Sequence, residues 1–293
     1  MLLHNNCIAC MMKQVLMVMG SNDIPPERQV EIMRGMIGPL MELPAGINPS
    51  DAMSSMVNYA VEQMGGGDFY LADKRVQNAQ ALELVPLVNE LIDQEEDRLC
   101  GALKAAAAGN IIDMTFGTEF DVEGSLRRCM QEGFSVMDYD LFTEKLHSCD
   151  SLVYLLDNAG EIVFDRLLME RIQDWRTSRG LPPIEITAVV KGGPALNDAL
   201  MEDAQFAGLP GLCHVVSTGI NYLGVPVPLA RPEIGELLER APLIIAKGQG
   251  NYETLEGEHG LCGKLFHLLK VKCVHVENLI GAPMGSVIFQ LKR

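Results

Sequence analysis

The stretch LVYLLDNAGEIVFDRLL, residues 152–168, begins with five consecutive apolar or aromatic residues and then meets a carboxylate and an amide. A short apolar run of this kind is typical of a strand that is buried on both faces, as in parallel sheets. Beyond Gly160 the apolar residues recur at helical spacing as far as Trp175. The stretch therefore predicts a β-α unit whose strand ends on Asp157 and Asn158.

The same alternation of strands and helices continues towards the C-terminus. The apolar runs are LVYLL (152–156), IEITAVV (184–190), CHVVS (213–217), PLIIA (242–246) and KCVHV (272–276), and the helical segments lie near 161–175, 198–207, 230–240 and 251–258. This rhythm is typical of β-α-β units, so we predict a Rossmann-like three-layer α/β/α fold with a mainly parallel sheet. Ligands of such sheets bind at the carboxyl ends of the strands.

The first half of the chain is predicted to be helical. PPERQVEIMRGMIGPLMEL (25–43) has two prolines at a helix entry, NPSDAMSSMVNYAVEQM (48–64) opens with capping residues, and residues 72–108 are periodic throughout. We therefore predict a helical N-terminal domain over residues 1–148. A Rossmann-like α/β domain over residues 149–293 would carry the functional site.

The composition indicates a globular protein and limits its partners. Of 293 residues, 48% are hydrophobic and 21% are charged, with a formal net charge of −16. This charge argues against nucleic acid and against anionic membrane as partners, because both favour clustered Lys and Arg. No apolar run reaches the roughly 20 residues needed to span a bilayer, and the N-terminus lacks the basic lead of a signal peptide. We expect a cytoplasmic protein.

Four of the predicted strands bring polar residues and glycine to one edge of the sheet. They end, in chain order, in Asp157-Asn158, in Lys191-Gly192-Gly193-Pro194 with Asn197-Asp198 just beyond, in Ser217-Thr218-Gly219, and in Lys247-Gly248-Gln249-Gly250-Asn251. Any one of these endings is an ordinary turn or helix cap. Tight turns, however, do not also require two lysines and two pairs of Asp with Asn.

The chemistry of these strand ends is that of a hard metal and a phosphate. Asp157, Asn158 and Asp198 offer oxygen ligands of the type that Mg²⁺ and Mn²⁺ prefer, and they leave coordination positions open. Lys191 and Lys247 are placed to neutralise an anionic group, while backbone N–H groups beside glycine can bind its oxygens. Such a site can polarise a phosphoryl group and activate a water.

Several of these segments resemble a known family. LLDNAGEIVFDRLL, KGGPALNDALMEDA and AKGQGNYETL, with AAAAGNIIDM and CIAC earlier in the chain, are similar to the DUF89 (ARMT1-like) family of damage-control phosphatases, in particular to its prokaryotic branch with an N-terminal CxxC. The resemblance implies a helical N-terminal part, a Rossmann-like core and hydrolysis of phosphate monoesters of small, damaged or surplus metabolites. It also implies a divalent metal: Mg²⁺, Mn²⁺, Co²⁺ or Ni²⁺.

The resemblance assigns roles to particular residues. Its metal-binding residues fall on Asp157, Asn158 and Asp198, and its Lys-Gly-x-x-Asn phosphate-binding motif falls on Lys247, Gly248 and Asn251. In the family, the segment with Asn110 and Asp113 approaches the site from the helical half, so these two are candidates for substrate contacts or are helix caps.

Four further residues are candidates for contacts with the substrate. Glu161 can orient a water or a substrate hydroxyl, or it can complement the helix dipole as a first-turn acid. Lys191 at a parallel-strand end is poorly explained by packing, which favours a phosphate contact. Ser217 and Thr218 can donate hydrogen bonds to phosphate, or can form the turn alone.

The pair Cys7 and Cys10 forms a CxxC motif, which supplies half of a tetrahedral zinc site. Another cysteine could complete such a site, the pair could be a redox pair, or it could be structural. We favour the structural reading and do not count these thiols among the catalytic residues.

We therefore predict a metal-dependent phosphatase that acts on a small phosphorylated metabolite. The alternative enzyme is a carboxyl methyltransferase that uses S-adenosylmethionine, an activity also proposed for the family's eukaryotic branch. It is less favoured because the first strand ends in DNAGE and not in a glycine-rich loop, and because the two lysines have no role in methyl transfer. A non-catalytic module that binds a metal or a nucleotide is the third possibility, and it predicts binding without turnover.

Overall fold

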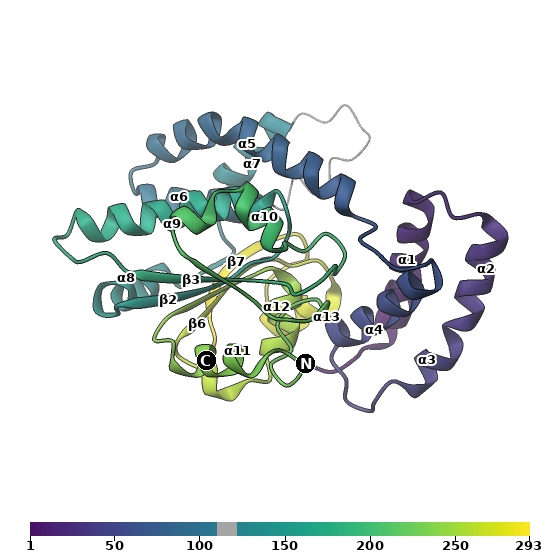
Figure 1. Cartoon of the computed structure of the whole chain (residues 1–293). Coiled ribbons are helices and arrows are strands. Elements are labelled where there is room, and N and C mark those ends of the chain that lie inside the picture. The colour runs from purple at the N-terminus through teal and green to yellow at the C-terminus, as the bar shows by residue number, and fades with distance from the viewer. Residues whose placement is uncertain (110–121) are drawn as a thin grey trace.

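The computed structural model describes residues 1–109 and 122–293. Its centre is a seven-stranded sheet with the order β1-β7-β6-β5-β2-β3-β4. The strands are β1 (Val136–Met137), β2 (Ser151–Leu155), β3 (Glu185–Val190), β4 (His214–Ser217), β5 (Ile244–Lys247), β6 (Leu265–Lys270) and β7 (Val287–Leu291). All neighbouring pairs are parallel except β6 with β7. The predicted mainly parallel sheet is confirmed (Figure 1).

Helices cover both faces of this sheet. One face carries α5 (Leu71–Gln94), α6 (Arg98–Ala108), α7 (Val122–Glu132), α8 (Tyr139–Ser148), α9 (Glu161–Thr177) and α10 (Met201–Phe206), and the other carries α11 (Pro232–Arg240), α12 (Gly248–Leu255) and α13 (Val274–Ile280). Successive residues of a strand point to opposite faces. Accordingly, Leu152 and Tyr154 of β2 join the core beneath α6 and α9, whereas Val153 and Leu155 join the core beneath α11. The three-layer α/β/α architecture is confirmed.

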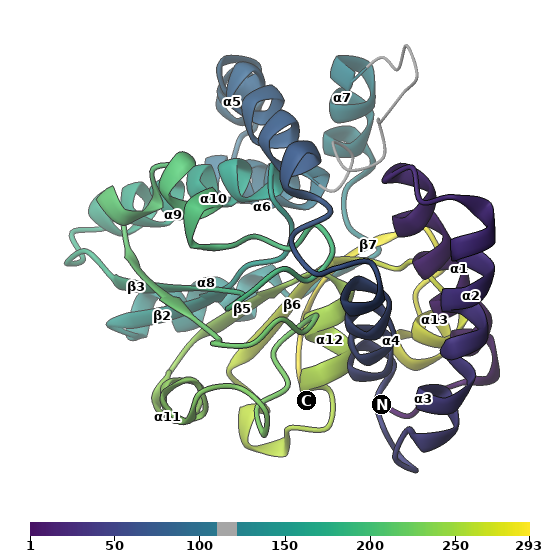
Figure 2. The ribbon, with the colours of Figure 1, turned by 45° about the vertical axis from the view of Figure 1, so that its right-hand side comes forward.

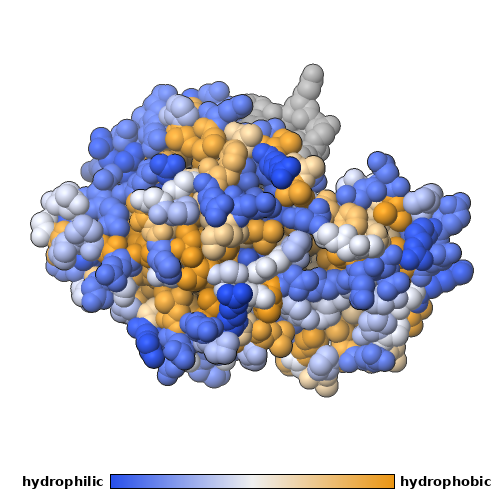
Figure 3. All heavy atoms as spheres, in the orientation of Figure 1, coloured by the Kyte–Doolittle hydropathy of each residue, from blue (hydrophilic) through white to orange (hydrophobic). Residues whose placement is uncertain are grey.

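The first four helices form a lobe beside the sheet. They are α1 (Asn5–Ser21), α2 (Pro26–Gly35), α3 (Ile37–Glu42) and α4 (Pro49–Gln63), and they share a hydrophobic core of their own that is rich in methionine. We call them the α1–α4 lobe. Figure 2 shows the lobe to one side of the sheet, and the surface is notched between the lobe and the remaining chain (Figure 3). Among the described residues, none of the helices has the length and apolar character needed to span a bilayer.

The segment before residue 149 contributes to the sheet as well as to the lobe. Strand β1 pairs with β7 at one edge, and α5 and α6 pack in the same core as the strands. The division into domains at 148 and 149 stays a prediction.

The run KCVHV (272–276) is not a strand, contrary to expectation. Strand β6 spans the preceding apolar run, Leu265–Lys270, and the chain enters α13 at Val274. Lys272 and Cys273 therefore lie just beyond the carboxyl end of β6, at the same edge as the other strand ends. This shift places a lysine where the sequence analysis expected the middle of a strand.

His267 of β6 is a buried imidazole whose two nitrogens have no hydrogen-bond partner among the described residues. Burial, followed by the charge of Lys292, lowers the pKa of His267 to about 3. In the unfolded chain the imidazole has a pKa of about 6.5. The unfolded state therefore binds more protons between these two values, and this residue makes stability fall as the pH is lowered through that window.

We expect His267→Leu to remove that contribution. The difference in free energy of unfolding, variant minus wild type, should increase as the pH is lowered from about 7 to about 4. Urea unfolding of both proteins across that range measures the difference, and a difference that does not change with pH would contradict the prediction.

Candidate active site

The site lies where the strand order reverses. The chain passes outward from β2 through β3 to β4 and then returns to β5 on the other side of β2. Crevices at such switch points, outside the carboxyl ends of the strands, are where α/β sheets bind ligands. Asp157 and Asn158 follow β2, and Gly248 follows β5, so both sides of this switch point carry residues of the predicted site.

A short crossing segment brings Asp198 to Asp157 and Asn158. The backbone N–H of Ala199 donates to the carbonyl of Asp157 at 2.7 Å, and the N–H of Ala159 donates to the carbonyl of Asn197 at 2.9 Å. Asn158 and Asp198 form an isolated antiparallel bridge. Backbone pairing, and not a helix, therefore holds the three predicted metal ligands together.

Asp198 is not a helix cap. The predicted helix near 198–207 begins only at Met201, as α10. The Asp198 carboxylate forms an ion pair with Lys191, at 3.4 Å from Nζ, and both side chains are buried. Lys191 thus compensates the charge of one predicted metal ligand.

The turn into α9 fixes the orientation of Asn158. Gly160 adopts a φ of +74°, which favours glycine, and its N–H donates to the Asn78 side chain at 2.6 Å. The Asn158 amide N–H group donates to Asp157 at 3.1 Å and to Glu161 at 3.2 Å. Because the amide nitrogen is turned to the carboxylates, the carbonyl oxygen of Asn158 is the atom offered to a ligand.

Lys247 lies beneath the site and uses all three of its N–H donors. Its Nζ donates to the carbonyl of Ala106 at 2.9 Å, to Glu161 at 2.5 Å and to Asp165 at 2.6 Å. Burial disfavours the ammonium, but the two carboxylates outweigh it and raise the pKa of Lys247. Tyr154 completes the cluster by donating to Asp165 at 2.7 Å. In this arrangement the lysine balances the carboxylates of α9.

Gly248 permits the close approach of Asp157. Its φ is +77°, and a Cβ at this position would collide with the Asp157 carboxylate. Both the left-handed backbone and the space for that carboxylate therefore require glycine here.

The edge carries more buried negative charge than positive charge. Four buried carboxylates (Asp157, Glu161, Asp165 and Asp198) stand against two buried ammonium groups (Lys191 and Lys247), an excess of two negative charges. Burial, followed by the charges of Asp198 and Glu161, raises the pKa of Asp157 well above its usual range. A cation placed at Asp157 would relieve this repulsion.

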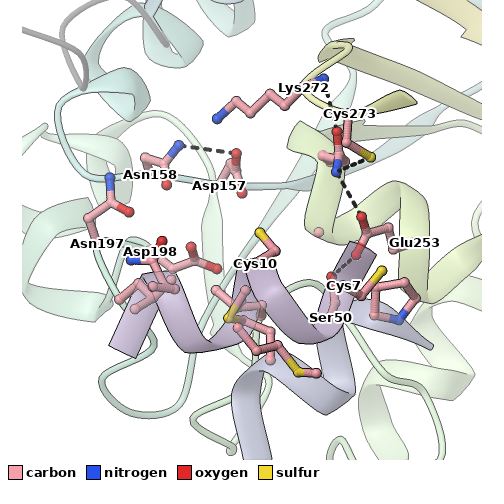
Figure 4. A pocket seen from close by; sticks show the side chains of 18 of the residues that line it. Cys7, Cys10, Ser50, Asp157, Asn158, Asn197, Asp198, Glu253, Lys272 and Cys273 are labelled. Atoms are coloured by element: carbon pink, nitrogen blue, oxygen red, sulfur yellow. Dashed lines mark hydrogen bonds between the residues drawn. The ribbon is translucent and has the colours of Figure 1, made fainter. Parts of the chain in front are cut away.

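A pocket of about 860 Å³ opens over this edge, between the strand ends and the α1–α4 lobe. Asp157, Asn158, Asn197 and Asp198 lie along one wall, and Ser50, Glu253 and Cys273 lie at another end (Figure 4). Among the described residues that line the pocket, Lys272 is the one lysine or arginine. Its charge lowers the pKa of Asp157, and its side chain extends over that wall.

Other predicted residues lie behind the pocket wall. The Asn251 amide donates to the carbonyl groups of Lys247 at 2.7 Å and Leu156 at 3.3 Å. The Ser217 hydroxyl donates to the carbonyl of Lys191 at 3.3 Å, and the Thr218 hydroxyl accepts from the N–H of Gly192 at 3.1 Å. These contacts brace the strand-end loops. Asn110 and Asp113 lie outside the described residues.

The CxxC pair faces the same pocket from α1. Cys7, Cys10 and Cys273 all line it, and all eight cysteines of the chain are free thiols. Burial raises the pKa of both Cys7 and Cys10. The proximity of Cys273 was not foreseen, because this residue belonged to the mispredicted strand.

The fold and this edge define an α/β protein with an acidic, oxygen-rich site at a topological switch point. Residues 3–288 match the damage-control phosphatase ARMT1-like domain, and the chain belongs to that family. This membership confirms the resemblance to the DUF89 family; its placement in the CxxC-bearing branch stays a prediction.

Named relatives match over most of the chain. The damage-control phosphatase PH1575 of Pyrococcus horikoshii is 29% identical over 285 residues, covering 96% of this chain and 95% of the relative. A damage-control phosphatase of Archaeoglobus fulgidus is 33% identical over 234 residues, covering 78% and 77%. The crystal structure of the DUF89 family protein PH1575 superposes with a TM-score of 0.89 at 28% identity and covers 100% of both chains.

Proposed function

We propose that this chain is a metal-dependent phosphatase that hydrolyses phosphate monoesters of small metabolites. Two of its relatives are named damage-control phosphatases. The observation that carries the metal dependence is the junction of Asp157, Asn158 and Asp198 at a strand edge where buried carboxylates outnumber buried ammonium groups by two.

The donor set fits a hard divalent ion. Two carboxylates and an amide carbonyl are oxygen ligands, and they leave positions for a phosphate oxygen and a water. Among the described residues, no three His, Cys, Asp or Glu side chains are placed to hold an ion by themselves. When bound, Mg²⁺, Mn²⁺, Co²⁺ or Ni²⁺ supplies Lewis-acid polarisation and lowers the pKa of a bound water.

The protein's own residues then have distinct tasks. Asp157, Asn158 and Asp198 would hold the ion through their side-chain oxygens. Lys272, whose side chain extends over the wall that carries Asp157, binds the phosphoryl oxygens and stabilises the charge that develops on them. Lys191 and Lys247 act from behind by holding the carboxylates in place, and Gly248 leaves room for Asp157.

The test is phosphate release from a panel of phosphorylated metabolites by chelator-treated protein, with and without each of the four metals. We expect release only after a metal is added back. No release with any metal, from protein shown to be folded, would contradict the proposal. That outcome would favour the methyltransferase, or the module that binds without turnover.

Lys272→Gln tests the assignment of the phosphate-binding cation. A hydrogen bond to a charged group contributes about 1.5–3 kcal/mol, so kcat/KM should fall by roughly 10- to 100-fold. Steady-state kinetics on the best substrate of the panel measures the change. Lys270→Gln, two residues earlier and outside the pocket lining, is the matched control and should change kcat/KM by less than about twofold. Equal effects of the two variants would reject the assignment.

A further inference from the structure

The pocket has a second charged end that the hydrolysis does not use. Glu253 of α12 lines it and is 7% exposed. Its carboxylate accepts a hydrogen bond from the Ser50 hydroxyl at 2.6 Å and another from the Gln249 amide at 2.8 Å. These contacts join α4 of the lobe to α12 of the α/β core, so the carboxylate is held rigidly in the wall.

This end is electrostatically separate from the strand-end site. Burial raises the pKa of both Asp157 and Glu253. The charges that act on Asp157 are those of Asp198, Glu161, Lys272 and Lys191, whereas hydrogen bonds from Ser50 and Gln249 and the charges of His275 and the N-terminus act on Glu253 and oppose the rise. Figure 4 shows Glu253 near Ser50, Cys7 and Cys273, with Cys10 between it and the wall that carries Asp198. We call this region the Glu253 end of the pocket.

The charges that line the pocket are unequal at its two ends. Its carboxylates are Asp73, Asp157, Asp198 and Glu253. In the proposed phosphatase, a metal and Lys191 would compensate Asp157 and Asp198, and Lys272 would bind the phosphate. Asp73 of α5 and Glu253 of α12 are the other two carboxylates of the lining. Among the described lining residues, no further lysine or arginine balances them.

We propose that Glu253 selects the part of the substrate that carries the phosphate, favouring esters of neutral or amine-bearing alcohols over esters with a second anionic group. This inference rests on the proposed phosphatase function. A buried carboxylate attracts an ammonium and accepts hydrogen bonds from hydroxyl groups. It repels a carboxylate or a second phosphate, and such repulsion is a common means of excluding wrong partners.

Three phenyl phosphates of matched size test the proposal. They carry a para aminomethyl, hydroxymethyl or carboxyl group, so that they differ in charge at the end remote from the phosphate. We would measure kcat/KM for each at pH 8 with Mn²⁺, where histidine is neutral. The proteins are wild type, Glu253→Gln and the control Glu258→Gln, whose side chain lies beyond α12 and outside the pocket lining.

Wild type should prefer the ammonium compound to the carboxylate compound by about tenfold or more, and Glu253→Gln should remove most of that ratio. Glu258→Gln should leave it within about twofold. A wild-type ratio at or below one, an unchanged ratio in Glu253→Gln, or an equal change in both variants would overturn the proposal. If Glu253→Gln fails to fold, the wild-type ratio decides.

The same compounds separate this inference from the phosphatase proposal. If wild type releases no phosphate from any of them, their dissociation constants with Mn²⁺ present are measured by calorimetry. If wild type binds the ammonium compound more tightly than the carboxylate compound and Glu253→Gln does not, the role of Glu253 is supported. Catalysis would be rejected in that case. Equal affinities for the three compounds would overturn the role of Glu253 as well.

Discussion

Asp157→Asn should lower kcat/KM for phosphate release by more than about 100-fold, because even residues that only orient a metal ligand change metal affinity by about 10- to 100-fold. The substitution keeps the size of the side chain but removes the charge that the proposed ion needs. Phosphate release at a Mn²⁺ concentration that just saturates wild type measures the effect. Asp150→Asn, an exposed aspartate just before β2, is the control and should be as active as wild type.

The stability of the same variant provides an independent readout. Asp157 is repelled by Asp198 and Glu161, so its neutral replacement should leave the metal-free protein at least as stable as wild type. Added Mn²⁺ should raise the Tm of wild type only, since a ligand stabilises the state that binds it. An active Asp157→Asn, or one that Mn²⁺ stabilises as much as wild type, would contradict the assignment of Asp157 as a ligand.

Lys247→Met should lower the free energy of unfolding by roughly 3–5 kcal/mol, the usual effect of removing one partner from a buried ion pair. The variant would leave Glu161 and Asp165 buried without their shared ammonium group. Urea unfolding measures the loss. Adding Asp165→Asn should recover part of it, because the two residues are in direct contact and their effects are coupled.

This variant also decides between two roles for Lys247. The family motif assigns the lysine to the phosphate, whereas the structure directs its three N–H groups to Ala106, Glu161 and Asp165. A stability change below about 1 kcal/mol with a large rise in KM would favour direct phosphate binding. A large loss of stability, with KM unchanged in the folded fraction, would favour the supporting role.

The fold was predictable where local pattern and packing agree. The runs that became β2, β3, β4 and β5 are short, apolar and bounded by turn residues, so each was placed within one or two residues. The run at 272–276 has the same composition but lies at the strand end, and the real strand precedes it. The helix expected over 25–43 is divided at Met36, where α2 ends and α3 begins, and α1 was not predicted.

The site was predictable to the extent that topology decides it. Parallel strands end at one edge, which was enough to bring Asp157, Asn158 and Asp198 together. The contacts of Lys247 were not predictable, since its partners come from α6 and α9. The role of Glu253 was not predictable, because its hydrogen bond to Ser50 joins residues 203 positions apart and leaves no trace in the local sequence pattern.

The central claim is tested most directly by titrating chelator-treated protein with Mn²⁺. Bound Mn²⁺ and phosphate release are both measured in each sample. The substrate is 4-nitrophenyl phosphate, and the proteins are wild type and Asp157→Asn. The account predicts that the release rate of wild type rises in proportion to bound Mn²⁺ up to one ion per chain. The variant should neither bind Mn²⁺ nor release phosphate. Full release without metal, or equal Mn²⁺ binding by the variant, would contradict it.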